Sequence, residues 1–321
     1  MKKFNEIFID KTKYGEKIQT SEYEKQGKHI IVDQGQAEIA GYTNREEGLF
    51  NEVPVIIFGD HTRLIKYIDE PFFLGADGVK VLRSKEKNAN YKYLYYALKS
   101  AKIPNTGYNR HFKWLKEVEI NYPDSVKQEK IVDILDRVSD VIEKRKAELS
   151  YLVTLIKARF VEMFGDPIRN TQNRPTTEFI NVVKMQRGFD LPVQDRQQDG
   201  EIPVYGSNGA LDYHNVAKIH GGVITGRSGT IGKVFYTEGD FWPLNTSLFS
   251  ADTHGNNVIY LGYLLQLFDL TRFVEGTGVP TLNRNMFHNK QIIDVPIDEQ
   301  RVFAAFVNEI DKSKLQKFSA A

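Results

Sequence analysis

The chain has 321 residues, of which 41% are hydrophobic and 26% are charged, and this composition predicts folded domains rather than a disordered segment. Lys plus Arg number 43 and Asp plus Glu 42, so any nucleic-acid site must come from local clusters of charge. The chain has no cysteine and no apolar run near the ~18 residues of a membrane span, which excludes disulfides, thiolate catalysis, Cys-based zinc sites and membrane insertion. We therefore expect a cytoplasmic protein with no membrane partner.

Residues 1–122 combine strand and helix patterns. Short apolar or alternating runs between turns rich in Gly, Asn and Asp predict strands at His29–Val32, Val53–Phe58 and Val79–Leu82. Tyr91–Leu98 predicts the start of a helix, and a short run at Val118–Tyr122 leads into a proline. This part of the chain is therefore expected to be of mixed α and β structure.

One long helix is predicted from Lys127 to Phe164, with a length of about 57 Å at about 1.5 Å per residue. Pro123 precedes it and Gly165–Pro167 ends it. Its apolar residues recur three, four or seven positions apart in a narrow stripe, here called the seam: Ile131, Leu135, Val138, Ile142, Leu149, Leu152, Ile156, Phe160 and Met163. Such a stripe is typical of a helix that packs lengthwise on another helix, so the seam needs a partner helix in this chain or in another.

After Pro167 the chain repeats its earlier pattern, which indicates a duplicated domain. Five matches occur in the same order at offsets of 167 to 175 positions. They pair Phe4–Ile7 with Phe179–Val182, His29–Val32 with Glu201–Val204, Ile57–Lys66 with Ile224–Lys233, Asn109–Arg110 with Asn283–Arg284, and Gln128–Val138 with Gln300–Ile310. A helix closes each copy.

The second closing helix is the shorter one. It is predicted from Gln300 to about Lys317, or about 27 Å, so it can cover only half of the seam. We expect the segment from Leu149 to Met163 to stay uncovered and to bind a partner subunit or a second copy of the chain. The interface residues expected on this basis are Leu149, Leu152, Ile156, Phe160 and Met163.

Catalytic patterns are weak throughout. Gly226–Val234 looks superficially like a phosphate-binding loop, but Arg227 stands where a Walker motif needs Gly and Val234 where it needs Ser or Thr, so a hairpin turn is favoured. The seven histidines show no metal-ligand spacing, and no Ser/His/Asp set can be assembled. We therefore expect neither a catalytic nor a metal site.

Clusters suited to duplex DNA occur at matching places in both copies. Arg and Asn can each make two hydrogen bonds to a guanine or adenine edge, whereas Lys, Ser, Thr and His often hold phosphates. The candidates in the first copy are His61, Thr62, Arg63, Lys66, Tyr108, Asn109, Arg110, His111 and Lys113. Those in the second copy are Arg227, Ser228, Lys233, Thr281, Asn283, Arg284 and Asn285. Each cluster taken alone fits an ordinary turn equally well; their repetition favours DNA.

The chain as a whole resembles the specificity (S) subunit of a type I restriction-modification system. Four segments in order carry the resemblance, together with Gln300 at the start of the last helix: Gly59–Arg63, Phe160–Pro167, Gly226–Val234 and Gly276–Arg284. The resemblance implies an α+β fold in which two target recognition domains each read one half of a split DNA sequence. Long helices, packed as an antiparallel coiled coil, would hold the domains apart. The boundaries expected are 1–124 and 167–298 for the two domains, 125–166 for the spacer helix and 299–321 for the C-terminal helix.

The resemblance also implies the partners. The helices would dock methyltransferase subunits, two being expected, and restriction subunits would join through the complex on double-stranded DNA. Catalysis, S-adenosylmethionine, ATP and Mg would belong to those partners, so no cofactor is expected on this chain. The short last helix departs from the family pattern, which leaves the spacer length and self-association open.

Two other functions remain compatible with the residues. A free-standing DNA-binding protein would share the recognition loops but would not need an unpaired seam. In a pure assembly scaffold, the helix would bind the partners and the loops would only be turns. A nuclease or methyltransferase is disfavoured by the lack of catalytic motifs.

Overall fold

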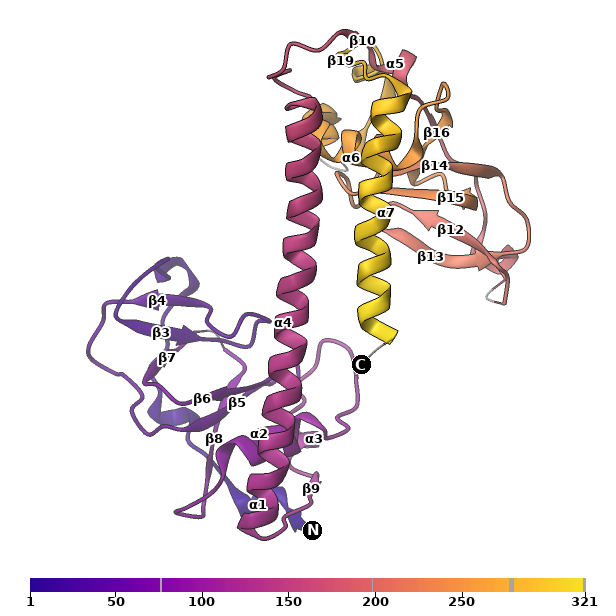
Figure 1. The fold of residues 1–321 in the computed structure, drawn as a ribbon. Coiled ribbons are helices and arrows are strands. Elements are labelled where there is room, and N and C mark those ends of the chain that lie inside the picture. Colours follow the sequence, from indigo (N-terminus) through magenta and orange to yellow (C-terminus); the bar gives the residue numbers. More distant parts are fainter. Residues whose placement is uncertain (76, 198, 277–279, 320–321) are drawn as a thin grey trace. The chain divides into compact units, whose positions relative to one another are not determined.

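The computed structural model describes residues 1–75, 77–197, 199–276 and 280–319, and the chain divides into two compact units (Figure 1). The first unit comprises Met1–Lys144 and the second Arg145–Ala321. One helix of 40 residues, α4 (Ser125–Phe164), starts in the first unit and ends in the second. Each unit combines helices with mostly antiparallel sheets, which confirms the expected α+β class.

A four-stranded antiparallel sheet with the order β2-β8-β5-β6 forms the centre of the first unit. A three-stranded sheet, β4-β3-β7, shares an apolar core with it, and β3 pairs with β7 in parallel. The strands are β1 (Lys2–Lys3), β2 (Phe8–Asp10), β3 (His29–Val32), β4 (Gly41–Thr43), β5 (Val55–Gly59), β6 (Ile65–Ile68), β7 (Phe72–Leu74), β8 (Val79–Ser84) and β9 (Glu119–Ile120). The helices are α1 (Phe4–Ile7), α2 (Tyr91–Lys99) and α3 (Phe112–Leu115).

Strand β5 shows how this core is assembled. Because successive side chains of a strand point to opposite faces, its apolar run is buried on both sides. Ile56 and Phe58 pack with the cluster that contains α2. Val55 and Ile57 pack with the cluster that contains the three-stranded sheet. The central sheet is therefore covered on one face by helix and on the other by sheet.

The second unit contains a six-stranded sheet with the order β11-β16-β14-β15-β12-β13. Two small antiparallel pairs, β10-β19 and β17-β18, complete its strands. The strands are β10 (Thr176–Glu178), β11 (Lys184–Arg187), β12 (Ile202–Gly206), β13 (Gly209–His214), β14 (Ile219–Gly226), β15 (Val234–Pro243), β16 (Ser247–Asp252), β17 (Val274–Glu275), β18 (Thr281–Leu282) and β19 (Gln291–Ile293). The helices are α5 (Phe179–Val182), α6 (Val258–Phe268) and α7 (Ile297–Ser319).

The two units share one topology. The order β11-β16-β14-β15 repeats β2-β8-β5-β6, and β10-β19 repeats the antiparallel pair β1-β9. Strand β12 joins the end of β15 in parallel, as β3 joins β7. The sheets therefore agree with the duplication seen in the sequence.

A buried glutamine makes the same contact in both units. Nε2 of Gln128 donates to the Pro123 carbonyl at 2.8 Å, and Nε2 of Gln300 donates to the Val295 carbonyl at 2.7 Å. The two glutamines are 172 positions apart, as are the two carbonyls. The side chains are 5% and 1% exposed, so each ties the start of its closing helix to the segment between that helix and the preceding strand, inside the fold.

The helix that lies on each sheet also begins in the same way. Asn90 Oδ1 accepts from the Tyr93 amide at 2.9 Å, and Asn257 Oδ1 accepts from the Tyr260 amide at 3.1 Å. An Asn side chain at this position satisfies an amide that the first turn leaves unpaired. Helices α2 and α6 are thereby aligned at an offset of 167 positions.

Most elements expected from the sequence are present with small shifts. Strand β5 starts at Val55 rather than Val53, because Pro54 has no N–H to give to a ladder. Helix α4 starts at Ser125, two residues early, because Asp124 Oδ1 accepts from the Lys127 amide at 2.9 Å and caps its first turn. The segment after Gly226 is the turn between the antiparallel strands β14 and β15, which confirms the hairpin.

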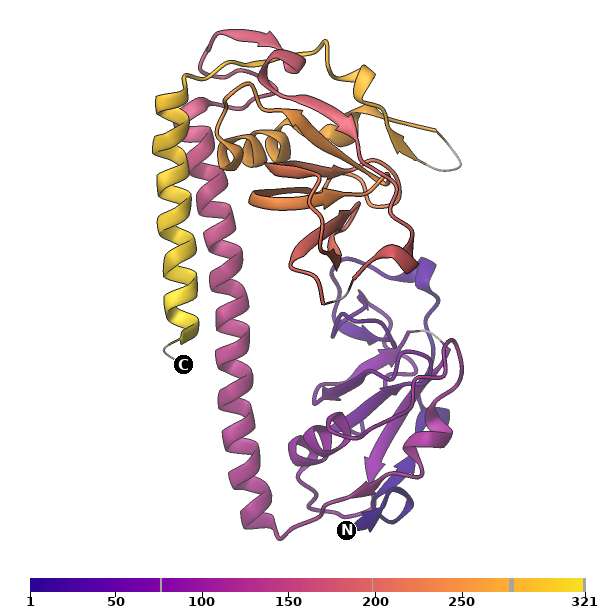
Figure 2. The same ribbon diagram turned by 90° about the vertical axis from the view of Figure 1, so that its right-hand side faces the viewer.

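Helix α7 runs antiparallel beside the end of α4 within the second unit (Figure 2). The rings of Phe160 and Phe303 lie 5.3 Å apart, and those of Phe164 and Phe303 lie 5.7 Å apart. Tyr260 of α6 stacks on Phe160 at 5.6 Å. This aromatic cluster anchors the end of α4 in the core of the second unit.

The expectation of an uncovered interface from Leu149 to Met163 is wrong. Ile156 and Phe160 are 0% exposed, and Leu152 and Met163 are partly buried against the same core. In an antiparallel pair the start of α7 meets the end of α4, so the short helix covers the part of the seam expected to be bare. Leu149 is half-buried.

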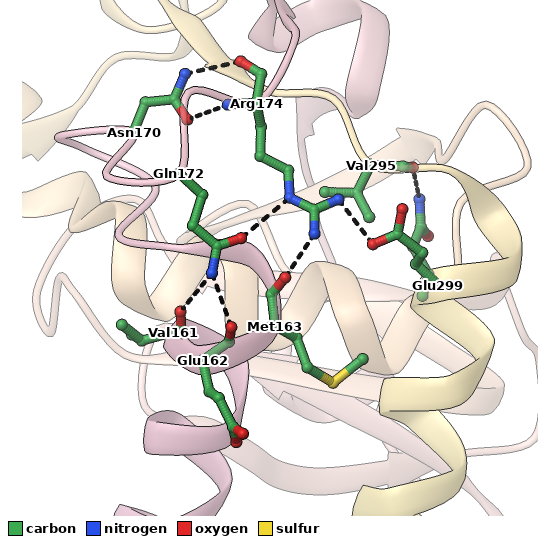
Figure 3. Close-up of polar contacts among 9 residues, drawn as sticks. Val161, Glu162, Met163, Asn170, Gln172, Arg174, Val295 and Glu299 are labelled. Atoms are coloured by element: carbon green, nitrogen blue, oxygen red, sulfur yellow. Dashed lines mark hydrogen bonds and ion pairs between the residues drawn. The ribbon is translucent and has the colours of Figure 1, made fainter.

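Polar contacts join the end of α4 to the start of α7 (Figure 3). The Arg174 guanidinium donates to the Met163 carbonyl at 2.6 Å and to Glu299 at 2.7 Å. Nε2 of Gln172 donates to the Glu162 carbonyl at 2.7 Å. The arginine thus satisfies the negative end of one helix dipole, while the carboxylate lies at the positive end of the other.

Candidate nucleic-acid interface

In the first unit, two loop segments predicted from the sequence come together beyond strand β5. The rings of His61 and Tyr108 stack with their centroids 4.9 Å apart and their planes at 10°. The Asp60 carbonyl accepts from the His111 amide at 2.8 Å, and Asp60 Oδ1 accepts from the Phe112 amide at 2.7 Å. The buried Asp60 carboxylate therefore fastens the loop before α3 to the β5–β6 turn.

The β5–β6 turn fixes the position of Arg63. The Gly59 amide donates to the Leu64 carbonyl at 2.8 Å, and the Arg63 amide donates to the Gly59 carbonyl at 2.7 Å. Arg63 closes this turn with φ of 61°, a left-handed conformation that is uncommon for arginine. Its guanidinium donates to the Ile103 carbonyl at 3.4 Å, which leaves the side chain only partly exposed.

Five of the predicted residues in this unit are exposed: Thr62, Tyr108, Asn109, Arg110 and Lys113. Tyr108 is 89% exposed, so its stacking on His61 presents an aromatic face to solvent. Exposed aromatic, amide and guanidinium groups are the types that contact bases and phosphates. This set of side chains is the candidate surface of the first unit.

Lys66 is buried, which contradicts its assignment to a DNA surface. It is 7% exposed, and its ammonium donates to the Asp33 carbonyl at 2.8 Å and to the Ala37 carbonyl at 2.5 Å. Burial lowers the pKa of Lys66, and the nearby Asp33 carboxylate opposes that shift. The lysine therefore holds the loop after β3 rather than a phosphate.

His111 is also a wrong assignment, because its side chain is 0% exposed. Its Nδ1 lies 3.0 Å from the Asp60 carbonyl, and its Nε2 lies 3.3 Å from the Thr106 hydroxyl. The ring thus links the turn after β5 to the loop before α3. It positions the neighbouring exposed residues and cannot itself reach a ligand.

In the second unit, the predicted residues gather around a pocket of about 350 Å³. The Leu282 amide donates to the Arg227 carbonyl at 2.8 Å, which joins β18 to the turn after β14. A bridge between Ser228 and Thr281 extends this contact. The pocket is lined by Arg187, Arg227, Leu248, Glu275, Thr281, Leu282, Asn283, Arg284 and Asn285. The structure thus brings together five of the seven candidates of this copy.

The other two candidates do not line the pocket. Lys233 is exposed, and its ammonium donates to Asn208 Oδ1 at 2.7 Å. Ser228 is partly buried, where it bridges to Thr281. Thr277, Gly278 and Val279, which belong to the Gly276–Arg284 segment that carries the family resemblance, lie outside the described residues.

The sequence match of Asn109 with Asn283 is shifted by two positions in the structure. The Met286 amide donates to the Asn283 carbonyl at 3.0 Å, and the Trp114 amide donates to the His111 carbonyl at 2.9 Å. The two donors are 172 positions apart, and so are the two acceptors, so Asn283 occupies the place of His111. The loops that precede His111 and Asn283 therefore differ in length, and the sequence match of Asn109 with Asn283 does not allow for that difference.

Three arginines give the second pocket a positive character. Arg187 and Arg284 line it beside Arg227, and Glu275 is the one carboxylate among its described lining residues. Burial lowers the pKa of His288 next to this cluster, and the charge of Arg284 lowers it further. Guanidinium groups bind phosphates and guanine edges with paired hydrogen bonds, so the pocket suits an anionic, base-bearing ligand.

Arg187 and Glu275 line the candidate pocket, and the sequence pattern does not predict either of them. Arg187 ends β11 opposite Leu248 of β16, and this pairing brings it to a loop 40 positions away in sequence. Glu275 pairs with Thr281 across the β17–β18 ladder. Only the strand pairing, which the sequence did not provide, could have identified them.

Among the residues that the structure describes, no group of three or more His, Asp and Glu side chains could hold a metal ion. None of the helices described is long and apolar enough to cross a membrane.

Comparisons with known proteins agree with the duplicated fold. The specificity subunit of the type I restriction enzyme EcoR124I/EcoR124II from Escherichia coli is 29% identical over 133 residues. The match spans 37% of this chain and only a third (33%) of that protein. The S subunit of a type I restriction-modification system from M. genitalium superposes with a TM-score of 0.60 at 18% identity, covering 99% of this chain and 91% of that one.

A second solved structure shows the same fold. It comes from a study of complex assembly and conformational transition in the type I R-M system, with a TM-score of 0.50 at 13% identity over 99% of this chain and 90% of that one. The family model for the type I restriction modification DNA specificity domain matches residues 1–151 and again residues 170–318. With both copies matched, the chain belongs to the type I restriction modification DNA specificity domain family.

Proposed function

We propose that the chain is the DNA-reading subunit of a type I restriction-modification complex and that each copy reads one half of a split target. The recognition domains would be residues 1–124 and 167–298, with 125–166 as the spacer helix and 299–321 as the C-terminal helix. The observation that carries the proposal is the duplication. Two units of one topology present polar and basic loops at equivalent places, after β5 and after β14.

Recognition would follow from the side chains that these loops expose. Lysine and arginine contacts to phosphates would set the register, and a few contacts to base edges would specify the sequence. In the first unit the exposed set is Thr62, Tyr108, Asn109, Arg110 and Lys113, with His61 and Arg63 behind it. In the second unit it is the arginine-lined pocket. Because the side chains differ, the two halves of the target should differ in sequence.

The proposal gives the chain no catalytic role of its own. Two methyltransferase subunits would dock on the helices, and restriction subunits would join through the complex. S-adenosylmethionine, ATP and Mg would be bound by those subunits. The complex would act on double-stranded DNA in the cytoplasm.

The test is to purify the chain with a methyltransferase subunit, expose DNA to the complex and sequence it for newly methylated positions. The proposal predicts one split motif with two specified halves and an unspecified gap. A complex that forms and methylates DNA without such a motif would contradict it. A control with the methyltransferase subunit alone should give no motif.

A further inference from the structure

Two lysines of the first unit, here called the lysine pair, lie over the ring of Phe112. The Lys80 ammonium lies 5.1 Å and the Lys116 ammonium 4.8 Å from the ring centroid. The Asp10 carboxylate lies 3.7 Å from the Lys80 ammonium, whereas no carboxylate of the described residues pairs with Lys116. An aromatic ring stabilises a cation over its face but does not neutralise the charge, so the lysine pair keeps a surplus of positive charge.

The lysine pair adjoins the candidate surface of the first unit. Phe112 begins α3, directly after the loop segment that carries Tyr108 and Arg110. Its amide donates to Asp60 Oδ1 at 2.7 Å, which holds the start of α3 against the turn after β5. Lys80 belongs to β8, which pairs with β5. Neither lysine has a sequence pattern that suggests a ligand, because β8 and α3 meet only in the fold.

The strand ladders show which residue of the second unit corresponds to Lys80. Phe58 of β5 pairs with Lys80 of β8, and Thr225 of β14 pairs with Leu248 of β16. Since β5 corresponds to β14 at an offset of 167 positions, Phe58 corresponds to Thr225. Leu248 therefore occupies the place of Lys80.

Backbone hydrogen bonds identify the counterparts of the other two residues. The Lys116 amide donates to the Phe112 carbonyl at 3.1 Å, and the His288 amide donates to the Arg284 carbonyl at 3.0 Å. The two donors are 172 positions apart, and so are the two acceptors. Arg284 therefore occupies the place of Phe112, and His288 that of Lys116.

This place in the second unit is the arginine-lined pocket. Leu248 and Arg284 line it together with Arg187 and Arg227. Both units are thus positive at one place, yet the cations do not occupy matching positions, because a lysine corresponds to Leu248 and a phenylalanine to Arg284. Two copies that gather positive charge at the same place from different residues point to an anionic ligand common to both.

We propose that Lys80 and Lys116 bind phosphates of the DNA backbone and set the register of the first unit on its half of the target. The inference rests on the proposed function, since double-stranded DNA is the anion that both units would share. A backbone phosphate is the same in every sequence, so the lysine pair should supply affinity without base preference. The neighbouring loop would read the bases.

The test measures how the affinity for duplex DNA depends on the KCl concentration, by fluorescence anisotropy, with the chain in complex with a methyltransferase subunit. Lys80→Gln with Lys116→Gln, the glutamine variant, should bind at least about tenfold more weakly near about 0.1 M salt. The slope of log affinity against log salt should become shallower by about two, one for each lost phosphate contact. A slope equal to that of the wild type would overturn the proposal.

Two further variants separate charge from structure. Lys80→Arg with Lys116→Arg keeps both positive charges and should keep the affinity and the slope, whereas a loss as large as that of the glutamine variant would assign the lysines a structural role. Lys99→Gln is the matched control, because Lys99 is an exposed lysine of the same unit that lies 5.1 Å from the centroid of another ring, Tyr95. It should leave the slope unchanged; an equal change would show that any lysine of the unit contributes.

The readouts distinguish this inference from the proposed function. A wild-type complex that methylates no split motif would contradict the proposed function. A split motif together with a wild-type slope in the glutamine variant would overturn only the phosphate site. The glutamine variant should methylate the same motif as the wild type, and a relaxed half-site would show instead that the lysines read bases. Binding of inorganic phosphate that the glutamine variant loses, with DNA binding intact, would assign the site to a free anion.

Discussion

The two units share a frame, meaning their strand order and the buried polar contacts that hold their helices, and they differ in the apolar surface around it. Gln128 and Gln300 make the same buried contact, and Asn90 and Asn257 cap equivalent helices. Yet the second unit buries an aromatic cluster around Phe160, where the first unit has an open groove of about 720 Å³ beside the start of α4. A few buried polar contacts together with the strand order are therefore enough to keep the frame, while the apolar surface around it is free to diverge.

The recognition loops diverge as well. The first unit exposes a tyrosine stacked on a histidine, whereas the second gathers three arginines around a pocket. The sequence match pairs Lys66 with Lys233, but the strand ladders pair Lys66 with Ile57 and Phe235 with Ile224, so Lys233 lies two positions before the place that corresponds to Lys66. Lys66 is buried against carbonyls, whereas Lys233 is exposed before β15. A match in the sequence thus need not mark an equivalent place in the fold, and substitutions at the two lysines test this difference.

The largest expected difference concerns the aromatic cluster. Phe160→Ala should lower the free energy of unfolding of the second unit by about 3–5 kcal/mol, because the ring is fully buried. Ile131→Ala, in the open groove of the first unit, should cost less than about 2 kcal/mol. The chain has two tryptophans, Trp114 in the first unit and Trp242 in the second, so urea unfolding of single-tryptophan variants follows each unit. Equal losses at the two positions would refute the difference in packing.

The two lysines that the sequence match pairs give the next largest contrast. Lys66→Met should destabilise the first unit by about 1–3 kcal/mol, because the carbonyls of Asp33 and Ala37 lose their donor. Lys233→Met should change stability by less than about 0.5 kcal/mol, because that side chain is exposed. Thermal unfolding measures both. A stable Lys66→Met protein that has lost a half-site would restore this lysine to the DNA surface.

Arginine substitutions sharpen the comparison at the proposed DNA surfaces. Arg63→Asn with Arg110→Ala should relax one half of the methylated motif, and Arg227→Ala with Arg284→Ala should relax the other, at about 1–3 kcal/mol for each lost base contact. Asn is chosen at position 63 because it tolerates the positive φ found there. Motif sequencing of the methylated DNA is the measurement. Uniform weakening of both halves would instead indicate phosphate contacts alone.

The smallest effect concerns pH. Burial and the charge of Arg284 lower the pKa of His288, so the folded chain takes up a proton less readily than the unfolded chain. Stability of the second unit should therefore fall as pH drops below the unfolded value of 6.5 towards the lowered pKa. His288→Gln keeps an acceptor for the Met185 amide and should remove this dependence. Urea unfolding followed by Trp242 between about pH 7.5 and about pH 5.5 tests it; an unchanged slope in the variant would count against the assignment.

Periodicity and punctuation predict the elements well, for physical reasons. The seam spacing predicts α4 to within two residues because a helix must present one apolar face, and Pro123 and Gly165 mark its ends. Strand β3 follows from its unbroken apolar run between turns. These signals are local, so they predict an element without knowledge of the segments that pack against it.

What the sequence could not provide is burial decided by distant segments. In the sequence, Lys66 and His111 have the pattern of exposed loop residues. In the structure, the carbonyls after β3 surround Lys66, and the Asp60 carbonyl contacts the His111 ring. The prediction that the seam is uncovered near the end of α4 is wrong because helix lengths alone do not show where two antiparallel helices start to overlap. Arg187 joins its site only through the pairing of β11 with β16.

The most direct test of the central claim, that two recognition units are spaced by α4, is a change in the length of that helix. A repeat of residues 138–144 inserted after Lys144 adds about 10 Å and keeps the seam nearly in phase. DNA rises about 3.4 Å per base pair, so the gap in the methylated motif should lengthen by up to about three base pairs. Both half-site sequences should stay the same. An unchanged gap, or altered half-sites with the gap preserved, would contradict the account.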